Sequence, residues 1–362
     1  MKKLFLISVA IISIGALILG GCGEPAAEPA EPAAPAEPAA PAEAIEFSLI
    51  SWTPPGVEKY VQLEEFAERV KQGTNGKLTV RLFPPGSLVA SPMELWKAIA
   101  AGVVDIGSGP RLDVSGRDLG SALEVFASDS PATSVNVYLM HEVYDKFPEY
   151  QEEWKDNKIL CFTASGTAYI YTATKEVRVP ADLQGLQIRL PNARWPIETM
   201  KTLGGTPVAV PTSEMYMALQ KGTVDGTTSP FDGLKEHRLA EVCDYVTVVG
   251  CYAGLAPYMG MNWDSYNNLA PDVQAAFDEV VAWYMEAEPQ LCDVVTQAGY
   301  DFGLETGTEY IYPTPDEMAQ WDAILVPWKD TICKELDDKG LPGTEVRKFV
   351  EERIEYYKSQ MK

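Results

Sequence analysis

The chain has few histidines and few basic residues for its 362 amino acids. The two histidines, His141 and His237, do not cluster with cysteines along the sequence, so no zinc-binding spacing is present. Lysine and arginine number 29 against 52 acidic residues, which gives a formal net charge of −23. Such a surface does not suit nucleic acid, whose phosphates need basic partners. An anionic small ligand would need a local positive group to hold it.

The sequence also lacks the common signatures of catalysis. It has no serine nucleophile elbow, no paired-histidine metal motif and no phosphate-binding glycine loop. Gly204-Gly205 follows an expected helix instead of opening one, so it reads as a helix end. We therefore expect no catalytic residues, no metal and no cofactor. An enzyme acting on carboxylic acids remains the weaker alternative, because no nucleophile–base pair is recognisable.

Cysteine is also sparse. After Cys22 the sequence holds an odd number of cysteines, so at least one is unpaired within the chain. A chain of this length does not need disulfides to fold, which favours buried free thiols, although one pair is close enough in sequence to bond. These residues are Cys161, Cys243, Cys251, Cys292 and Cys333, of which Cys243 and Cys251 could pair.

The N-terminus has the pattern of a secretory signal. Lys2 and Lys3 precede an apolar run over residues 4–19, and Gly20-Gly21-Cys22 follows. We predict a signal peptide over residues 1–21, and its end resembles the lipobox of bacterial lipoproteins, in which the cysteine is lipidated. Residues 22–44, rich in Ala, Pro and Glu, would then be an extended spacer. The protein should be anchored to the membrane outside the cytoplasm, in the periplasm or at the cell surface. An uncleaved membrane span is the alternative, but the run is short for one.

A motif occurs twice in the folded part, at residues 94–105 and 214–225. Both copies read Glu-x-aromatic-x-Ala-aliphatic-x-x-Gly-x-Val-Asp, and no gap interrupts the match. The spacing is too long for a solenoid repeat and suggests two similar α/β lobes. Two lobes would leave a cleft between them, where small ligands bind. The competing interpretation is a coincidence of common helix-stop signals.

Hydrophobic periodicity supports two α/β lobes. Alternating apolar residues predict strands near residues 47–52, 78–82 and 186–190, separated by helical patterns, which favours largely parallel sheets. A long helix is expected from near Pro271 to about Gly303, with Pro289 inside it. We expect lobe I at residues 45–165 plus about 255–294. Lobe II should comprise residues 166–254 plus about 295–362.

Arg189 is the most suggestive polar residue. It lies between Ile188 and Leu190 in an expected apolar strand, where a charge is costly unless it is paired. A ligand carboxylate could pair with it through two parallel hydrogen bonds. The residues alone leave a second possibility equally open, in which Arg189 bonds a protein carboxylate or is exposed at a sheet edge.

Residues 181–230 resemble the solute-binding proteins of tripartite ATP-independent periplasmic (TRAP) transporters, the DctP group. Three motifs carry the resemblance: Asp182-Leu183-x-Gly185-Leu186-x-Ile188-Arg189-x-Pro191-Asn192, Leu203-Gly204-Gly205-x-Pro207-Val208 and Ser213-Glu214-x-Tyr216-x-Ala218-Leu219-Gln220-x-Gly222-x-Val224-Asp225-Gly226. Lobe I adds Gly76-Lys77-Leu78 and the first copy of the repeat. The resemblance implies a two-lobed, type II-like periplasmic-binding-protein fold, with hinge strands and a long helix spanning both lobes.

The same resemblance implies a receptor that delivers an organic acid to TRAP permease subunits in the membrane. Arg189 would pair with the ligand carboxylate, and Asn192, Thr228 and Ser229 would line the pocket. Some members carry a second arginine early in the second lobe, where this chain has Gly166-Thr167-Ala168-Tyr169. That difference favours a monocarboxylate with an apolar or aromatic body over a dicarboxylate or a sialic-acid-like ligand.

Aromatic and hydroxyl groups could complete this pocket. The candidates are Trp52, Tyr169, Trp195 and Thr212, although each aromatic ring could equally be part of the core. A sensory receptor subunit for a membrane kinase remains an alternative function, because its binding lobes would have the same sequence features.

Overall fold

The computed structural model describes residues 44–111 and 116–361, all within one compact unit, Glu43–Lys362. The predicted signal peptide, Cys22 and nearly all of the spacer lie outside the described residues. Within the described ranges, no helix has the length and apolar character needed to cross a membrane.

Lobe I is built on a five-stranded sheet with the order β2-β1-β3-β10-β4. Strand β1 pairs in parallel with β2 and β3, whereas β10 runs antiparallel to both of its neighbours, β3 and β4. The strands are β1 (Ile45–Ser51), β2 (Leu78–Phe83), β3 (Ile106–Pro110), β4 (Lys158–Phe162) and β10 (Pro257–Met261).

Lobe II is built on a six-stranded sheet with the order β11-β9-β5-β8-β6-β7. In it, β6 pairs in parallel with β7 and β8, and β5 runs antiparallel to β8 and β9. The strands are β5 (Ser165–Thr172), β6 (Gln187–Leu190), β7 (Thr206–Ala209), β8 (Gly226–Ser229), β9 (Tyr245–Gly254) and β11 (Glu309–Ile311).

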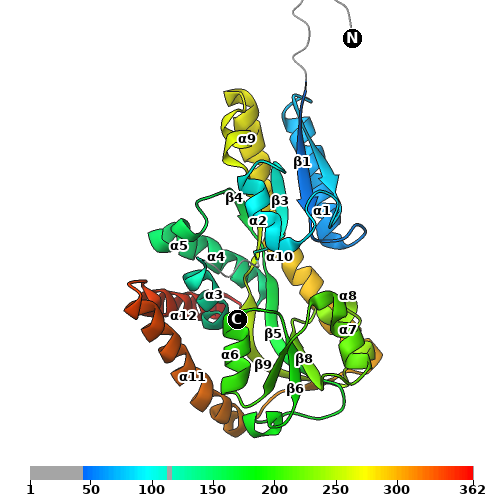
Figure 1. Ribbon diagram of the computed structural model, residues 1–362, viewed down its shortest axis with the longest axis vertical. Coiled ribbons are helices and arrows are strands. Elements are labelled where there is room, and N and C mark those ends of the chain that lie inside the picture. Colours follow the sequence, from blue (N-terminus) through cyan, green and yellow to red (C-terminus); the bar gives the residue numbers. More distant parts are fainter. Residues whose placement is uncertain (1–43, 112–115, 362) are drawn as a thin grey trace, which may run out of the picture. The chain divides into compact units, whose positions relative to one another are not determined.

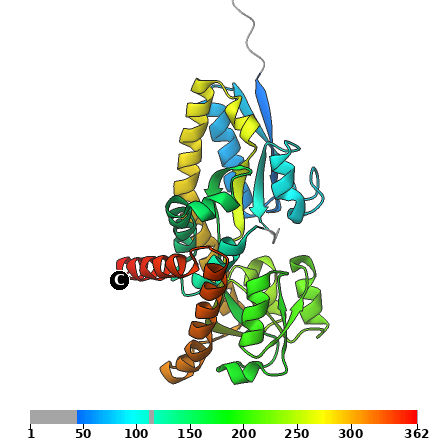
Figure 2. The ribbon, with the colours of Figure 1, turned by 60° about the vertical axis from the view of Figure 1, so that its left-hand side comes forward.

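The chain passes between the two sheets directly from strand to strand. Thr163 and Ala164 link β4 to β5, and Leu255 and Ala256 link β9 to β10. Helix α10 (Pro271–Thr306) packs against α1 (Glu58–Gly73) of lobe I and against α8 (Gly233–Glu236) of lobe II. Figures 1 and 2 show α10 running alongside both sheets. The expected two-lobed α/β fold with hinge strands and a spanning helix is confirmed.

The remaining helices pack on the sheets or, towards the C-terminal end of the chain, mainly on other helices (Figure 1). They are α2 (Pro92–Ala100), α3 (Asp118–Phe126), α4 (Thr133–Lys146), α5 (Pro148–Glu153), α6 (Arg194–Thr202), α7 (Thr212–Gln220), α9 (Trp263–Asn267), α11 (Pro315–Asp338) and α12 (Gly343–Gln360). Short 3-10 turns lie at Pro180–Leu183 and Leu239–Glu241.

The repeated motif forms the same unit in each lobe. Helix α2 leads into β3, and α7 leads into β8, and each helix is followed by a glycine with a left-handed backbone. Gly102 has φ +68° and Gly222 has φ +65°, which other residues adopt only with strain. In lobe I, β3 begins at Ile106, and Val103 lies in the bend before it with 62% of its surface exposed.

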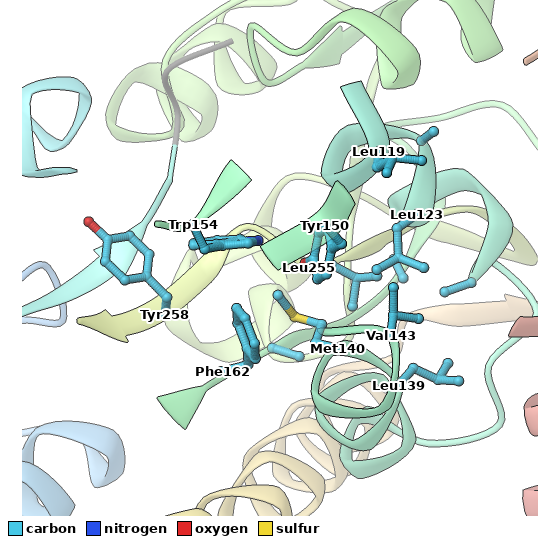
Figure 3. Close-up of a cluster of buried hydrophobic side chains, with 14 of the residues drawn as sticks. Leu119, Leu123, Leu139, Met140, Val143, Tyr150, Trp154, Phe162, Leu255 and Tyr258 are labelled. Atoms are coloured by element: carbon cyan, nitrogen blue, oxygen red, sulfur yellow. The ribbon is translucent and has the colours of Figure 1, made fainter. Parts of the chain in front are cut away.

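The largest core cluster of the described residues joins strands of the lobe I sheet to helices α3, α4, α5, α11 and α12. It is rich in aromatic rings from α5, β4 and β10. The centre of the Trp154 ring lies 5.0 Å from the ring centre of Phe162 and 5.6 Å from that of Tyr258 (Figure 3). Helices α11 and α12 add aliphatic side chains to the same cluster. Arg353 of α12 fixes this packing through two 2.7 Å hydrogen bonds to Glu142 of α4. The five described cysteines are all buried and unpaired.

Candidate functional site

The candidate site lies where the carboxyl ends of the strands of both sheets meet. In lobe I, β1, β3 and β4 run in one direction and end towards the crossings, and in lobe II the same is true of β6, β8 and β9. Ligands of open α/β sheets bind just outside such carboxyl ends. Residues that follow these strands are therefore the candidates for contact with a ligand.

Arg189 points to one face of β6 while its neighbours point to the other. Ile188 and Leu190 are fully buried in a cluster with Met200 and Trp321, from α6 and α11. Because side chains alternate along a strand, Arg189 faces α7 on the opposite side. There its Nε donates to the carbonyl of Val210 at 2.8 Å.

The other guanidinium nitrogens of Arg189 contact α7. Nη2 donates to Thr212 Oγ1 at 2.9 Å, and Nη1 lies 3.2 Å from the sulfur of Met215. Arg189 is only 3% exposed, and burial lowers its pKa from the usual value. Among residues 44–111 and 116–361, no carboxylate forms an ion pair with it. The described residues therefore do not show Arg189 bonded to a protein carboxylate.

This environment leaves part of the guanidinium available. The three contacts use one hydrogen of Nε, one of Nη1 and one of Nη2, so each Nη keeps a second hydrogen with no acceptor in the described part of the chain. Two parallel N–H groups match the two oxygens of a carboxylate. A buried cation with only neutral partners is costly, and an incoming anion would remove that cost.

Thr228 and Ser229 are both buried in β8. Thr227 pairs with Arg189 in the sheet and shares its face, where its hydroxyl lies 3.3 Å from Met215. Thr228 therefore points to the opposite face, where its hydroxyl lies 2.9 Å from that of Tyr252. Burial raises the pKa of Tyr252, so its phenol stays neutral. Sequence reasoning missed Tyr252, because nothing local distinguishes it from other strand tyrosines.

The predicted aromatic residues do not gather in one place. Trp195 is 1% exposed and packs 5.9 Å from Trp328 in the core. Trp52 directly follows β1, and its ring covers Gly109, where a Cβ atom would come within 2.6 Å of it. Asn192 is exposed in the short link between β6 and α6. Trp52 and Asn192 thus lie at the carboxyl ends of strands in lobes I and II.

Tyr169 belongs to a different hollow. It stacks on Phe231 with ring centres 4.4 Å apart, and both rings line a cavity of about 560 Å³ with Thr133, Thr296 and Tyr300. This cavity lies between β5, α10 and the start of α4, and Arg189 is not among its lining residues. Tyr169 also pairs with Ser229 of β8 in the sheet.

Two basic residues at the carboxyl ends of lobe I strands were not predicted. Arg111 directly follows β3, is 4% exposed and lies 4.2 Å above the ring of Trp96. Lys59 is the second residue of α1, the helix that follows β1, and its ammonium group contacts the β4–β5 crossing. The topology could have indicated both, since each follows a parallel strand closely in sequence.

Within the described ranges, no group of three or more histidine, cysteine or acidic side chains is placed to hold a metal ion.

Comparison with known proteins adds the family. The model of the family DctP, described as bacterial extracellular solute-binding protein, family 7, matches residues 51–335. The C4-dicarboxylate-binding periplasmic protein DctP of Rhodobacter capsulatus is 26% identical over 298 residues, which cover 81% of this chain and 87% of DctP.

Two solved structures show a similar fold. A TRAP periplasmic solute-binding protein from Desulfovibrio salexigens has a TM-score of 0.73 and 28% identity, covering 86% of this chain and 96% of its own. A marine metagenome TRAP protein specific for aromatic acids, from an unidentified microbe, was crystallised with 3-hydroxybenzoate. It has a TM-score of 0.76 and 24% identity, and the match covers 87% of this chain and 99% of the metagenome protein. Because the family model matches most of the folded chain, this protein belongs to the DctP family of TRAP solute-binding proteins.

Proposed function

We propose that this protein binds an organic acid between its lobes, with Arg189 holding the carboxylate, and delivers it to the membrane permease of a TRAP transporter. The observation that carries the proposal is the buried guanidinium, 3% exposed and contacted only by neutral groups of the described chain. The lobes would close around the ligand by a hinge motion. The proposal includes no catalytic step.

The ligand we propose is a monocarboxylate with an aromatic or apolar body. Gly166-Thr167-Ala168-Tyr169 offers no second arginine beside Arg189 in lobe II, so a second carboxylate would lack a matching cation there. One structure of similar fold holds 3-hydroxybenzoate, whereas the Rhodobacter relative is named for C4-dicarboxylates. Trp52, Asn192, Thr212 and Ser229 are the residues we propose to complete the site around Arg189.

Calorimetry on the alanine and lysine variants of Arg189 tests the proposal. The titrants are 3-hydroxybenzoate, succinate and any acid that mass spectrometry finds retained by the purified protein. Removing one partner of a buried charge pair costs about 2–5 kcal/mol, so Arg189→Ala should weaken binding by roughly 30- to several-thousand-fold. Arg189→Lys should recover only part, because an ammonium cannot present two parallel N–H groups.

Lys221→Ala provides the matched control, since Lys221 is an exposed cation just after α7 and should not affect binding. Binding by Arg189→Ala within a few-fold of the unaltered protein would show that Arg189 is structural. Tighter binding of succinate than of 3-hydroxybenzoate would argue for a dicarboxylate ligand.

We also propose that residues 1–21 are removed as a signal peptide and that lipidated Cys22 anchors the protein to the membrane. The pattern Leu19-Gly20-Gly21-Cys22 motivates this part. Cys22→Ser should then release the protein from the membrane fraction. If that variant still sediments with membranes after a carbonate wash, the anchor is not the lipid on Cys22.

A further inference from the structure

Lys59 connects lobe I to the first crossing between the sheets. Its ammonium group donates to the carbonyl of Ala164 at 3.0 Å and lies 3.4 Å from the hydroxyl of Thr163. These two residues are the whole link between β4 and β5. Lys59 stands in the first turn of α1, so a lobe I helix directly contacts the link to lobe II.

Helix α10 completes this cluster. Glu288 lies 3.4 Å from the Lys59 ammonium group and accepts a hydrogen bond from the Thr163 hydroxyl. Cys292, one turn further on, donates to the carbonyl of Ala164 at 3.4 Å and lies 3.3 Å from Lys59. Both α10 side chains are 1% exposed. We call these five residues the Lys59 cluster: Lys59, Thr163, Ala164, Glu288 and Cys292.

The second crossing is also bonded to lobe I. The carbonyl of Ala256 accepts from the backbone N–H of Arg111, just after β3, at 2.8 Å. The backbone N–H of Thr163 donates to the carbonyl of Pro257 at 3.3 Å, which joins the two crossings to each other. Both links between the sheets are therefore hydrogen-bonded to residues of lobe I.

Immediately beyond the crossings, the pairing of β5 with β9 becomes irregular. The register shifts between Ser165 and Thr167 and again between Ala168 and Ile170. Three glycines, Gly166, Gly250 and Gly254, lie along this irregular pair. Irregular pairing leaves fewer ladder hydrogen bonds to resist bending than a regular ladder has.

We propose that Lys59 is a positioning residue that fixes where the molecule bends. The Lys59 cluster, together with the hydrogen bonds of Asp293 and Thr296 to the start of α4, joins lobe I, both crossings and α10 through Thr296 into one rigid body. Lobe II then turns about the irregular β5–β9 pair. This goes beyond the proposed carboxylate binding and does not depend on which ligand the protein takes.

Electrostatics is consistent with the role of Lys59 as a fixed charge. Although burial opposes the charged form, the neighbouring Cys292, Glu288 and Asp232 raise the pKa of Lys59 overall. By contrast, the link between Glu58 of α1 and Lys235 of α8, at 3.8 Å, joins two half-exposed side chains. Such an exposed pair contributes little, so it should not hold the lobes together.

Distances between pairs of spin labels test this proposal without a ligand. The labels are placed on introduced cysteines in a Cys22→Ser background, since the five described native thiols are buried. The pair Val61→Cys and Val294→Cys spans the Lys59 cluster, and both positions are more than half exposed. The pair Val103→Cys and Met217→Cys reports the movement of lobe I against lobe II.

The first label pair should give a single narrow distance distribution and the second a broader one. Lys59→Gln should broaden the distance distribution of the first pair, and Lys59→Arg should restore part of its narrowness. Because Lys59→Gln alone leaves Glu288 without its cation, Lys59→Gln/Glu288→Gln is measured beside it. The matched control is Lys77→Gln, which removes another lobe I lysine paired with α10, through Asp272 at 2.5 Å, and should change neither distribution.

Two results would overturn the proposal. One is a first-pair distribution as broad as that of the second pair in the protein with Lys59 intact. The other is a first-pair distribution that stays narrow both in Lys59→Gln and in the double variant. Neither result bears on carboxylate binding by Arg189, so the two proposals fail separately.

Discussion

Ile50 in lobe I and Arg189 in lobe II occupy equivalent places in two copies of one arrangement. In each lobe the final aspartate of the repeat accepts a hydrogen bond from a backbone N–H of the adjacent parallel strand. Asp105 binds Ser48 in this way at 2.8 Å, and Asp225 binds Gln187 at 2.7 Å. Two residues further along these strands stand Ile50 and Arg189, paired with Gly107 and Thr227.

The two equivalent positions differ in what surrounds them. Ile50 is fully buried in an apolar cluster that includes Leu95 and Ile99 of α2. Arg189 meets a hydroxyl, a carbonyl and a sulfur atom at α7. One backbone unit thus provides a core position in lobe I and a buried cation in lobe II. Lobe II therefore holds the charge that would select a carboxylate, whereas the equivalent position in lobe I is part of the core.

The largest expected effect comes from making the two positions identical. Arg189→Ile should weaken binding of the cognate acid by at least about 30-fold, because the carboxylate loses its charged partner. The free energy of unfolding without ligand should stay within about 1–2 kcal/mol or rise, since replacing buried charges by apolar groups is often neutral or stabilising. Calorimetry and urea unfolding measure the two effects.

Ile50→Val is the matched control for this change. It should lower the free energy of unfolding by about 0.5–1.5 kcal/mol and leave binding unchanged. A large loss of stability in Arg189→Ile, with no loss of affinity, would reverse the roles assigned to the two positions.

The two aspartates provide a second contrast. Asp105 is half-buried and also accepts from the hydroxyls of Ser48 at 2.8 Å and Ser265 at 2.7 Å, whereas Asp225 is exposed. A hydrogen bond to a charged group contributes about 1.5–3 kcal/mol, so Asp105→Ala should destabilise the protein more than Asp225→Ala. Urea unfolding of both variants checks this. Equal losses would mean that the extra bonds of Asp105 add nothing.

His141 gives lobe I a pH dependence of its own. Burial lowers its pKa to about 4, and its Nε2 accepts from the backbone N–H of Phe162 at 3.2 Å. The unfolded chain binds the proton at a higher pH, so this contribution to stability is complete above about pH 6.5 and falls as the pH drops towards 4. The loss should be on the order of 2–3 kcal/mol.

His141→Gln keeps an acceptor and should remove this pH dependence. Burial raises the pKa of Glu124 and Glu153 to about 7, which gives the opposite trend. The informative quantity is therefore the difference in unfolding free energy between the unaltered protein and His141→Gln. It is measured from pH 7.5 to about pH 4, a range that includes these pKa values. A difference that does not change with pH would contradict the role assigned to His141.

Much of the fold could be predicted from the sequence because its signals are local or repeated. The matching motifs predicted two α/β lobes, and the long apolar pattern predicted a helix that the structure places at Pro271–Thr306. The setting of Arg189, a charge in an apolar strand, was also visible from its neighbours. These inferences depend on periodicity, on end signals and on a repeat, all of which are written along the chain.

The side-chain environments of the site depend on contacts that the chain order hides. Trp195 packs on Trp328 of α11, and Tyr169 stacks on Phe231, so neither ring can be placed from its own segment. Thr228 and Ser229 are neighbours in sequence but lie on opposite faces of β8 because side chains alternate along a strand. A motif indicates which residues are present, whereas the sheet determines which of them meet.

The absence of cross-links among the described cysteines bears on how such a chain reaches its destination. Protein export systems that move chains in an unfolded form require the chain to be free of cross-links until it has crossed the membrane. With its five described thiols unpaired, the body of this protein needs no oxidation step after passage to reach the fold seen here. It should fold equally well in reducing and oxidising surroundings, and the burial of each sulfur shields it from oxidants.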